Sequence, residues 1–430
     1  MDAATYRDYV NILHEELVPA MGCTEPIAIA YAAAVARQTL GRPAQRMEVE
    51  ASGNIIKNVK SVFVPNTGGL RGIPAAAAAG MAAGDPALEL EVLSSIGEGE
   101  QAAIRQYLAD TPIAVKLADS PFIFDIAIRA WAGEDSALVR IVNYHTNIVR
   151  VERNGQVLKE VEAQAAAEEG LTDKSVLTVK GILEFAREAA LADVEEAVGR
   201  QVRYNTAIAQ EGLRGDYGAN IGKVLLATYG DDVKIRAKAM AAAGSDARMN
   251  GCGLPVVIVS GSGNQGLTAS LPVVEYAKEL GADWETTLRA VLVSDLITIH
   301  LKAEIGRLSA YCGAVSAGCG SGAGIAWLYG REKEPQALLK DVSHTIVNAL
   351  AVDSGIVCDG AKASCAAKIA SAVDAGLLGF YMYQNGQQFR GGDGIISKGV
   401  EETIRNIGLL ATQGMRETDR EILDIMTTRC

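Results

Sequence analysis

Two cysteines stand seven positions apart in Cys358-Asp-Gly-Ala-Lys-Ala-Ser-Cys365, separated only by small and polar residues. If this stretch is helical, seven residues make almost two turns, and both sulfurs lie on one face. A third cysteine, Cys312, also stands among small residues. Three thiolates in an open pocket can hold three irons of a [4Fe–4S] cluster and leave the fourth iron free for substrate. The spacing is not a ferredoxin or zinc-ribbon pattern, so small buried hydrophobes are the alternative.

Cys23 stands in Gly22-Cys23-Thr24-Glu25-Pro26, directly before a predicted helix. The N-terminus of a helix stabilises a thiolate, so this position predicts a lowered pKa for Cys23. A thiolate here would serve as a base or a nucleophile. A buried, inert cysteine is the alternative interpretation.

The stretch Gly261-Ser-Gly-Asn-Gln-Gly266 matches the glycine pattern of a dinucleotide-binding turn. Pro272 interrupts the expected helix, no second strand with an acidic end follows, and the C-terminal part lacks alternating strand–helix units. We therefore interpret the stretch as a nest of backbone N–H, hydroxyl and amide groups that suits a carboxylate. Its candidate substrate-binding residues are Ser260, Ser262, Gly263, Asn264 and Gln265.

Other polar residues are candidates for the same substrate site. In Ser245-Asp246-Ala-Arg248, the guanidinium can pair with a carboxylate through two hydrogen bonds, and an ion pair between Arg248 and Asp246 is the alternative. Two polar clusters lie near strand-like sequence and fit structural turns equally well. These clusters contain Asn54, Lys57 and Asn58, and His145, Thr146 and Asn147.

The composition narrows the class of protein. The 430 residues carry a formal net charge of −12, which argues against nucleic acid or an anionic membrane as a partner. The N-terminus lacks the apolar core of a signal peptide, and no apolar run is long enough to span a bilayer. Seven cysteines in such a chain favour a reducing cytoplasm, where cysteines serve as ligands or catalysts more often than as disulfides.

The hydrophobic pattern predicts two kinds of structure. Strand-like alternation occurs at residues 47–52, 60–65, 88–93, 113–117, 122–131, 137–144 and 148–153, and Asn154-Gly155 predicts a hairpin. Helical periodicity occurs at residues 4–20, 27–40, 74–83, 98–109, 176–191, 194–212, 284–305, 337–348 and 401–413. We predict a mainly α-helical catalytic domain, residues 1–45 and 173–430, with an inserted α+β domain, residues 46–172, built on an antiparallel or mixed sheet.

Several of these stretches together resemble the L-cysteine desulfidases, a family related to the iron–sulfur L-serine dehydratases. The resemblance spans nearly the whole chain. It rests on Gly-Cys23-Thr-Glu-Pro, Lys57-Asn58, His145-Thr-Asn, Ser245-Asp-Ala-Arg, Ser-Gly-Ser262-Gly-Asn-Gln-Gly, Arg-Leu-Ser-Ala-Tyr-Cys312 and Cys358-Asp-Gly-Ala-Lys-Ala-Ser-Cys365.

The resemblance implies an oxygen-sensitive [4Fe–4S] enzyme that cleaves L-cysteine to pyruvate, ammonia and sulfide. It implies that Cys312, Cys358 and Cys365 ligate the cluster and that Cys23 is the acid/base. Cys430, the last residue, departs from the desulfidase pattern. In the related dehydratases a C-terminal cysteine reaches the open iron, although a frayed, exposed thiol is the simpler expectation for a terminal residue.

Three other functions stay open at this point. An iron–sulfur L-serine dehydratase differs from a desulfidase around one substrate atom. A pyridoxal-phosphate lyase would use Lys362 or Lys368, but no phosphate-binding context surrounds them. A non-enzymatic amino-acid sensor would need only the sheet domain and the nest. In each case the partner is a small amino acid, and a homodimer is compatible with the sequence.

Overall fold

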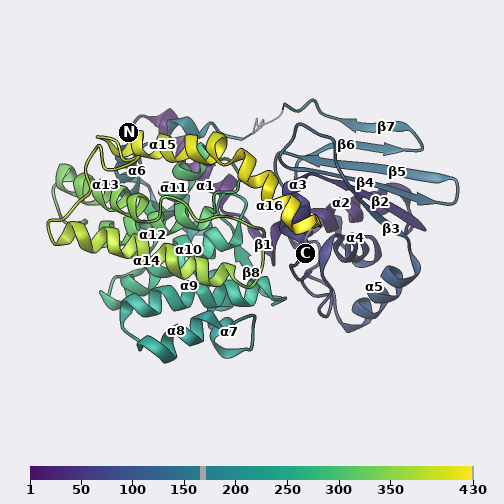
Figure 1. Ribbon diagram of the computed structural model, residues 1–430, viewed down its shortest axis with the longest axis horizontal. Helices are drawn as coiled ribbons and strands as arrows, with labels where there is room; N and C mark the ends of the chain where they lie inside the picture. The colour runs from purple at the N-terminus through teal and green to yellow at the C-terminus, as the bar shows by residue number, and fades with distance from the viewer. Residues whose placement is uncertain (165–170, 429–430) are drawn as a thin grey trace.

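The computed structural model describes residues 1–164 and 171–428. Figure 1 shows two regions side by side, a helical region and a region built on a sheet. The described residues form a two-stranded and a six-stranded sheet among many helices. The predicted fold class, mainly helical with an α+β part, is therefore confirmed. Cys430 lies outside the described residues.

The sheet region contains a mixed six-stranded sheet in the order β3-β2-β4-β5-β6-β7. Only β2 and β3 pair in parallel. The predicted hairpin joins β6 to β7, because Asn154 and Gly155 both adopt the positive φ that this tight turn requires. The strands are β2 (Arg46–Ala51), β3 (Ile113–Leu117), β4 (Asp125–Ala132), β5 (Asp135–Val142), β6 (Ile148–Arg153) and β7 (Gln156–Glu160).

Helices cover one face of this sheet. Helix α2 (Thr24–Leu40) packs on β4, β5 and β6, and α4 (Gly72–Ala83) packs on α2. A Cβ atom at Gly80 would lie 1.9 Å from the carbonyl oxygen of Ala30, so the glycine lets these helices touch. The region also contains α3 (Gly53–Val59), the 3₁₀ helix η1 (Pro86–Glu91) and α5 (Glu98–Asp110). The structure thus places α2 with the sheet, and the predicted division at residues 45 and 172 stays a prediction.

The helical region packs alanine- and glycine-rich helices at close range. A Cβ atom at Gly318 would lie 2.2 Å from the carbonyl oxygen of Ala372, so α12 and α14 meet backbone to backbone. The short strands β1 (Pro19–Met21) and β8 (Pro255–Val257) pair antiparallel. The helices are α1 (Ala3–Glu16), η2 (Lys174–Val176), α6 (Val179–Glu188), α7 (Leu191–Arg214), α8 (Ile221–Tyr229), α9 (Val233–Met249), α10 (Gly263–Glu279), α11 (Trp284–Ile305), α12 (Gly313–Gly330), α13 (Pro335–Val352), α14 (Cys365–Gln384), α15 (Val400–Leu409) and the short π-helix η3 (Leu410–Gly414).

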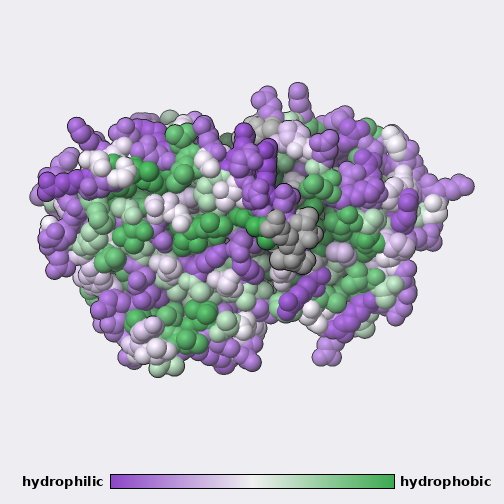
Figure 2. Space-filling model, in the orientation of Figure 1, coloured by the Kyte–Doolittle hydropathy of each residue, from purple (hydrophilic) through white to green (hydrophobic). Residues whose placement is uncertain are grey.

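The last helix, α16 (Arg416–Thr428), crosses from the helical region onto α3 of the sheet region (Figure 1). Hydrophilic side chains gather over it where the two regions meet (Figure 2). Asp419 binds Lys57 and Asn54 of α3, and Lys60 donates to the carbonyl oxygen of Met426. These polar contacts therefore hold α16 against α3 of the sheet region.

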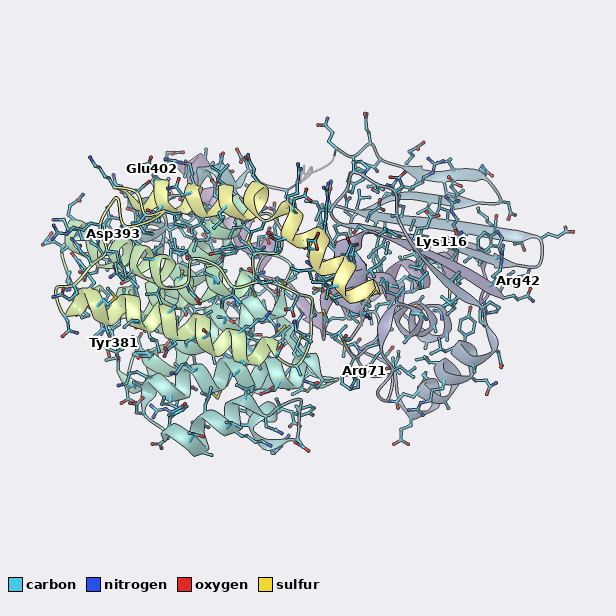
Figure 3. The ribbon with its side chains drawn as sticks, viewed as in Figure 1. Arg42, Arg71, Lys116, Tyr381, Asp393 and Glu402 are labelled. Carbon is cyan, nitrogen blue, oxygen red and sulfur yellow. The ribbon has the colours of Figure 1, made fainter. Side chains whose placement is uncertain are left out.

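Charged pairs elsewhere lie mostly at the periphery. Arg42 and Lys116, labelled in Figure 3, form ion pairs with Asp135 at 2.9 Å and Glu48 at 2.6 Å. Both cations are more than half exposed, so each pair contributes little to stability. Packing of buried side chains, rather than these surface ion pairs, therefore stabilises the two regions.

Four expectations from the sequence are wrong. Residues 60–65 form a turn with one isolated bridge, from Phe63 to Arg71, because α3 ends just before them. Residues 88–93 lie in and after η1, which Asp85 caps and Pro86 begins. Helix α10 continues through Pro272. Helix α14 is long and apolar enough to cross a membrane, although no such stretch was expected. Half of this apolar stretch is buried, and the helix packs on α9, α12 and α13, as a core helix does.

Candidate active site

The three predicted ligand cysteines lie together at the starts of two helices. Cys312 directly precedes α12, and Cys365 is the first residue of α14. The backbone N–H of Cys358 donates to the carbonyl oxygen of Ala310 at 2.6 Å, and that of Cys312 donates to Ile356 at 2.8 Å. These two bonds tie the chain before Cys312 to the loop that carries Cys358.

The stretch from Cys358 to Ser364 is an irregular loop, so a helix does not place the two sulfurs on one face. Gly360 explains the loop: its φ is +92°, and a Cβ atom there would lie 2.4 Å from the carbonyl oxygen of Lys57. The loop nevertheless brings the sulfurs together. The thiols of Cys312 and Cys358 form a hydrogen bond with each other. The charge of Cys365 raises the pKa of Cys312, and the charge of Cys358 raises the pKa of Cys365.

This set of donors fits an iron–sulfur cluster chemically. Three soft thiols face one another, and the hydrogen bond from Cys312, together with the positive charges of Lys57 and Lys368, lowers the pKa of Cys358. Within residues 1–164 and 171–428, no group of three or more His, Cys, Asp or Glu side chains surrounds the position of a single metal ion. A [4Fe–4S] cluster spreads its cysteine ligands over separate irons, so its three ligands need not converge on one point.

The lysines beside the cysteine loop are held by one carboxylate. Lys368 donates to Asp359 at 2.5 Å and to the carbonyl oxygen of Val357 at 2.7 Å, and Lys362 also pairs with Asp359. These ion pairs lower the pKa of Asp359 to about 2 despite its partial burial. Both lysines therefore serve as counter-charges here, which disfavours either as the free amine that pyridoxal phosphate needs.

Cys23 lies on the sheet side of the site, directly before α2. Its thiol donates to Glu25 Oε2 at 3.0 Å and packs with Val62 and Met249, against which Cys365 also packs. Burial and the charge of Glu25 raise the pKa of Cys23 well above its ordinary value. The expected lowering of this pKa is wrong, because desolvation and a neighbouring carboxylate outweigh the helix N-terminus.

Glu25 contacts three polar side chains of this part of the site, and the sequence analysis did not identify it as a site residue. Besides the Cys23 thiol, Oε2 accepts from the Thr24 hydroxyl at 3.2 Å, and Oε1 accepts from the Asn58 amide at 2.9 Å. Burial would raise the pKa of Glu25, but the hydrogen bond from Cys23 and the positive charge of Arg248 hold it below its ordinary value. The side chain is a buried, charged carboxylate. Its place two residues after Cys23 was the available signal.

His145 lies in the turn between β5 and β6, edge-on to Phe124 with ring centroids 4.8 Å apart. Burial lowers the pKa of His145 to about 4, so the ring is neutral. Its Nε2 has no hydrogen-bond partner among the described residues. A Cβ atom at Gly261 would lie 3.0 Å from the ring, so the glycine lets His145 approach the nest. Of its neighbours, Asn147 bonds the backbone of its own turn, donating to Val142.

The helical region supplies the predicted carboxylate-binding groups. Arg248 Nη1 and the Ser245 hydroxyl both bond to Asn264 Oδ1, at 3.0 and 3.1 Å. Asp246 instead accepts the backbone N–H of Gly222 at the start of α8, so no ion pair with Arg248 forms. A Cβ atom at Gly263 would lie 2.3 Å from Arg248 Nε, so the backbone of the nest lies directly against the guanidinium.

The nest also reaches the cysteines. Ser262 directly precedes α10, and a Cβ atom at Gly313 would lie 2.7 Å from the side chain of Gln265. Gln265 therefore lies against the residue that follows Cys312. The structure brings the sequence-predicted Cys23, Asn58, His145, Arg248 and nest residues to one place beside the cluster cysteines.

Two predicted substrate-binding residues have another partner. Asn54 donates to Asp419 Oδ2 at 2.8 Å, and Lys57 forms an ion pair with the other oxygen of Asp419. The Lys57 side chain is almost fully buried. A carboxylate of α16 thus pairs with two residues that were predicted to bind substrate, and the role of both residues in binding substrate stays a prediction.

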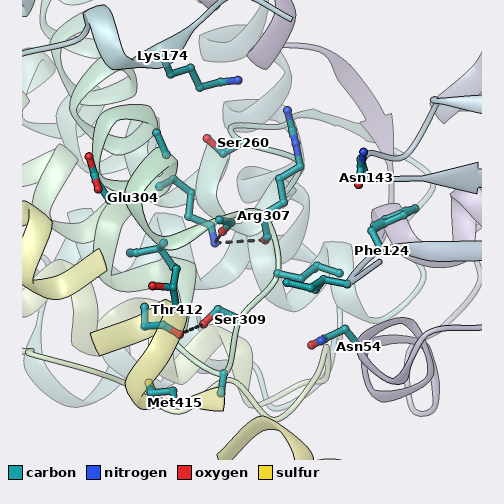
Figure 4. A pocket seen from close by; sticks show the side chains of 18 of the residues that line it. Asn54, Phe124, Asn143, Lys174, Ser260, Glu304, Arg307, Ser309, Thr412 and Met415 are labelled. Carbon is teal, nitrogen blue, oxygen red and sulfur yellow. Dashed lines mark hydrogen bonds between the residues drawn. The ribbon is translucent and has the colours of Figure 1, made fainter. Parts of the chain in front are cut away.

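A cavity of about 1320 Å³ opens between the two regions (Figure 4). Ser260, Lys57 and Ala310 line it, and each neighbours the site described above. Arg307 and Ser260 come from the helical region, and Asn54 and Phe124 come from the sheet region. Arg307 bonds to the buried Glu16 at 2.8 Å. Thr146 lines a smaller cavity of about 110 Å³ on the other side of Arg307.

The chain is similar to known proteins over most of its length. A family model described as serine dehydratase alpha chain matches residues 87–424. The chain is 58% identical over 425 residues to a UPF0597 protein of Desulfitobacterium hafniense, with 99% of this chain and 97% of the relative covered. A UPF0597 protein of Lachnoclostridium phytofermentans is 51% identical over 421 residues, with 98% and 99% covered.

The family match covers parts of both regions, since residues 87–424 run from the sheet region to α16. Serine dehydratases are lyases, and this family in general depends on an iron–sulfur cofactor. The names of these relatives give no substrate, so a preference for cysteine is left to the proposal below. The chain belongs to the serine dehydratase alpha chain family, together with the UPF0597 proteins.

Proposed function

We propose that this protein is a [4Fe–4S]-dependent β-elimination lyase that converts L-cysteine to pyruvate, ammonia and sulfide. The observation that carries the proposal is a gathering of buried polar atoms beside three facing thiols. Among the described residues, no partner exists for Asn58 Oδ1, His145 Nε2, Arg248 Nε or Gln265 Oε1. Each unsatisfied group costs about 1–3 kcal/mol. Their gathering at one place supports a small polar ligand there.

Cys312, Cys358 and Cys365 would hold the cluster, with Lys57 and Lys368 balancing the charge of the thiolates. When bound, the cluster supplies a Lewis-acidic iron that polarises the side-chain leaving group. The protein groups do the remaining work: they bind the amino acid, orient its α-hydrogen and keep water away. Their burial strengthens each charged contact with the substrate.

Arg248 and the nest suit the substrate carboxylate. The guanidinium already lies 3.0 Å from Asn264, and its Nε points to no described partner. The Ser262 and Gly263 backbone begins α10, where N–H groups and the helix dipole favour an anion. Neutral His145, beside Gly261 at the nest, can accept or donate one hydrogen bond to the amino group.

Cys23 is the group proposed to take the α-proton. Loss of that proton and of the sulfur leaves an enamine, which tautomerises and hydrolyses without help from the enzyme. The surroundings of Cys23 support a sulfur substrate. Val62 and Met249 pack with Cys23 beside Cys365, and their apolar or soft atoms favour a sulfur leaving group over a hydroxyl.

An iron–sulfur L-serine dehydratase is the second candidate, and the description of the matched family favours it. Serine elimination would use the same base and the same carboxylate site, with hydroxide as the leaving group. The remaining alternatives have weaker support. Lys362 and Lys368 are engaged with Asp359, and a sensor would not need three facing thiols. A cytoplasmic location and a homodimer stay part of the proposal.

The test is an anaerobic assay of the reconstituted protein with L-cysteine and L-serine, measuring pyruvate from both and sulfide from the first. We expect the larger kcat/KM for L-cysteine. A larger value for L-serine would move the assignment to the second candidate. Turnover of neither amino acid by protein with full iron content would contradict both.

A further inference from the structure

Cys23 and Glu25 form a buried pair whose geometry is more specific than that of a lone base. The thiol donates to Glu25 Oε2 at 3.0 Å, and the side chains of both residues are at most 8% exposed. The pair lies on the first turn of α2 and just before it, and Pro26 follows directly. A thiol that already donates its proton to a carboxylate can pass that proton on when it receives another.

Glu25 is held in one orientation by every element around it. Asn58 of α3 donates to Oε1 at 2.9 Å. The Thr24 hydroxyl shares its one proton between the carbonyl oxygen of Gly261 at 2.9 Å and Oε2 at 3.2 Å, which joins α2 to the nest. His145 and Arg248 face the carboxylate from the sheet region and the helical region. With this support, Oε2 stays directed at the thiol.

We propose that Glu25 is the final acceptor of the substrate α-proton and that Cys23 relays it; this inference rests on the proposed function. The carboxylate side chain has two tasks in this account. It fixes the thiol in the direction of the substrate, and it takes the charge that a thiolate would otherwise carry in an apolar setting. Glu25 acts through Cys23, so it is a positioning and proton-accepting residue.

The relay balances as follows. The Cα–H bond of the substrate breaks, and its proton bonds to the sulfur of Cys23 as the thiol proton moves to Glu25 Oε2. The Cα–H electron pair forms the Cα=Cβ bond, and the Cβ–S pair leaves with the substrate sulfur. Cys23 is again a thiol, and Glu25 is a neutral acid. Glu25 then returns its proton through Cys23 to the departing sulfide, which restores both groups.

The directions of the two pKa shifts agree with this resting state. Burial and Glu25 raise the pKa of Cys23, whereas the pKa of Glu25 lies below its ordinary value. The proton of the free enzyme therefore lies on sulfur and the charge on oxygen. A Cys23 thiolate acting alone would need the opposite distribution.

Glu25→Gln tests the relay, because the amide keeps the size of the side chain and cannot accept the proton. In anaerobically reconstituted protein we expect unchanged iron content, kcat lower by about 10²-fold, and a larger α-deuterium isotope effect on kcat. The isotope effect is the decisive readout. Damage that only reduces the number of loaded sites lowers the rate and leaves the isotope effect of the remaining sites as it was.

Two further variants complete the experiment. Glu25→Asp keeps a carboxylate on a shorter side chain and should recover part of the lost rate. Glu275→Gln is the matched control, since Glu275 is a buried glutamate near the end of α10, paired with Arg236 and Lys278. It should leave kcat and the isotope effect unchanged.

The outcomes separate the two proposals. Wild-type turnover with a Glu25→Gln variant that keeps more than half of kcat, or that loses rate with an unchanged isotope effect, overturns the relay and leaves the lyase proposal standing. A wild-type protein with full iron that turns over neither L-cysteine nor L-serine overturns both.

Discussion

The helical region and the sheet region treat a buried carboxylate in opposite ways. Asp295 of α11 is fully buried, its one hydrogen-bond partner among the described residues is Gln201 at 2.9 Å, and burial raises its pKa to about 8. Glu25 of α2 is also buried, yet its pKa is lowered and it accepts three hydrogen bonds. A carboxylate keeps its charge only where several donors replace the lost water.

The difference shows where chemistry is located in this molecule. Inside the helical region, Asp295 with one hydrogen-bond donor keeps its proton. At the junction, donors from both regions converge on Glu25, His145 and the cysteine loop. In the proposed function the helical region supplies the three thiols and Arg248, and the sheet region with α2 supplies the proton-transfer groups. Cofactor content and proton transfer should therefore respond to different substitutions.

The largest expected effect removes a thiol from the helical region. Cys358→Ser should lose most of its iron and all measurable turnover, because two thiols hold a cluster poorly and a serine hydroxyl is a weak ligand for it. The measurement is iron content and pyruvate formation after anaerobic reconstitution. Cys319→Ala is the control: Cys319 is buried on α12 but is not among the three facing thiols, and this variant should keep its iron. Full iron in Cys358→Ser would show that the ligand set is wrong.

A substitution on the sheet side should separate rate from cofactor. Cys23→Ala should keep the iron and lose about 10²–10⁴ in kcat, the usual contribution of a positioned acid or base. Iron analysis and turnover of the same sample decide the matter. If iron is lost together with the rate, Cys23 is a ligand, and the division of labour between the regions does not hold.

A smaller effect is expected at the polar contact that spans the two regions. Asp419→Asn removes the counter-charge from buried Lys57 and retains an oxygen for Asn54. If Lys57 and Asn54 bind substrate, the loss of this competitor lowers KM by about five-fold, equivalent to about 1 kcal/mol. Glu417→Gln, on an exposed position of α16, is the control. An unchanged KM with a lower melting temperature would assign both residues a structural role only.

Asp295→Asn should change stability and leave activity as it is. The folded state keeps the Asp295 proton up to about pH 8, whereas the unfolded state releases it near its ordinary value. Stability is therefore fully present at low pH and falls as pH rises toward 8, by about 1.4 kcal/mol per pH unit from this group. Denaturant unfolding from pH 5 to pH 8 should show a shallower fall in the variant. Parallel curves would mean that Asp295 is ionised in the folded protein.

The sequence allowed the fold class, the Asn154-Gly155 hairpin and most helices to be predicted, because local periodicity determines them. The same periodicity failed at residues 88–93, where Pro86 and the Asp85 cap favour a 3₁₀ turn. It gave no assignment between Cys358 and Cys365, where the close approach of Gly360 to Lys57 requires a loop. Local patterns carry no information about what a distant segment will bring nearby.

The charge states of the site were beyond the sequence for the same reason. A lowered pKa for Cys23 follows from its helix alone, but Glu25 and burial reverse it. Glu25 itself was visible in the motif, yet its role depends on Asn58, Thr24 and Gly261 meeting there. Likewise, the pairing of Asp419 with Lys57 joins residues far apart in the chain.

The central claim is that Cys312, Cys358 and Cys365 of the helical region hold an iron–sulfur cluster. This cluster would lie next to the proposed proton-transfer groups of the sheet region, Cys23 and Glu25. Its most direct test is iron and acid-labile sulfide analysis, with an absorption spectrum, of the protein purified without oxygen. We expect about four irons and four sulfides per chain, both lost together with turnover on exposure to air. A protein that turns over L-cysteine at full rate without iron, or that shows a pyridoxal-phosphate chromophore, would contradict the account.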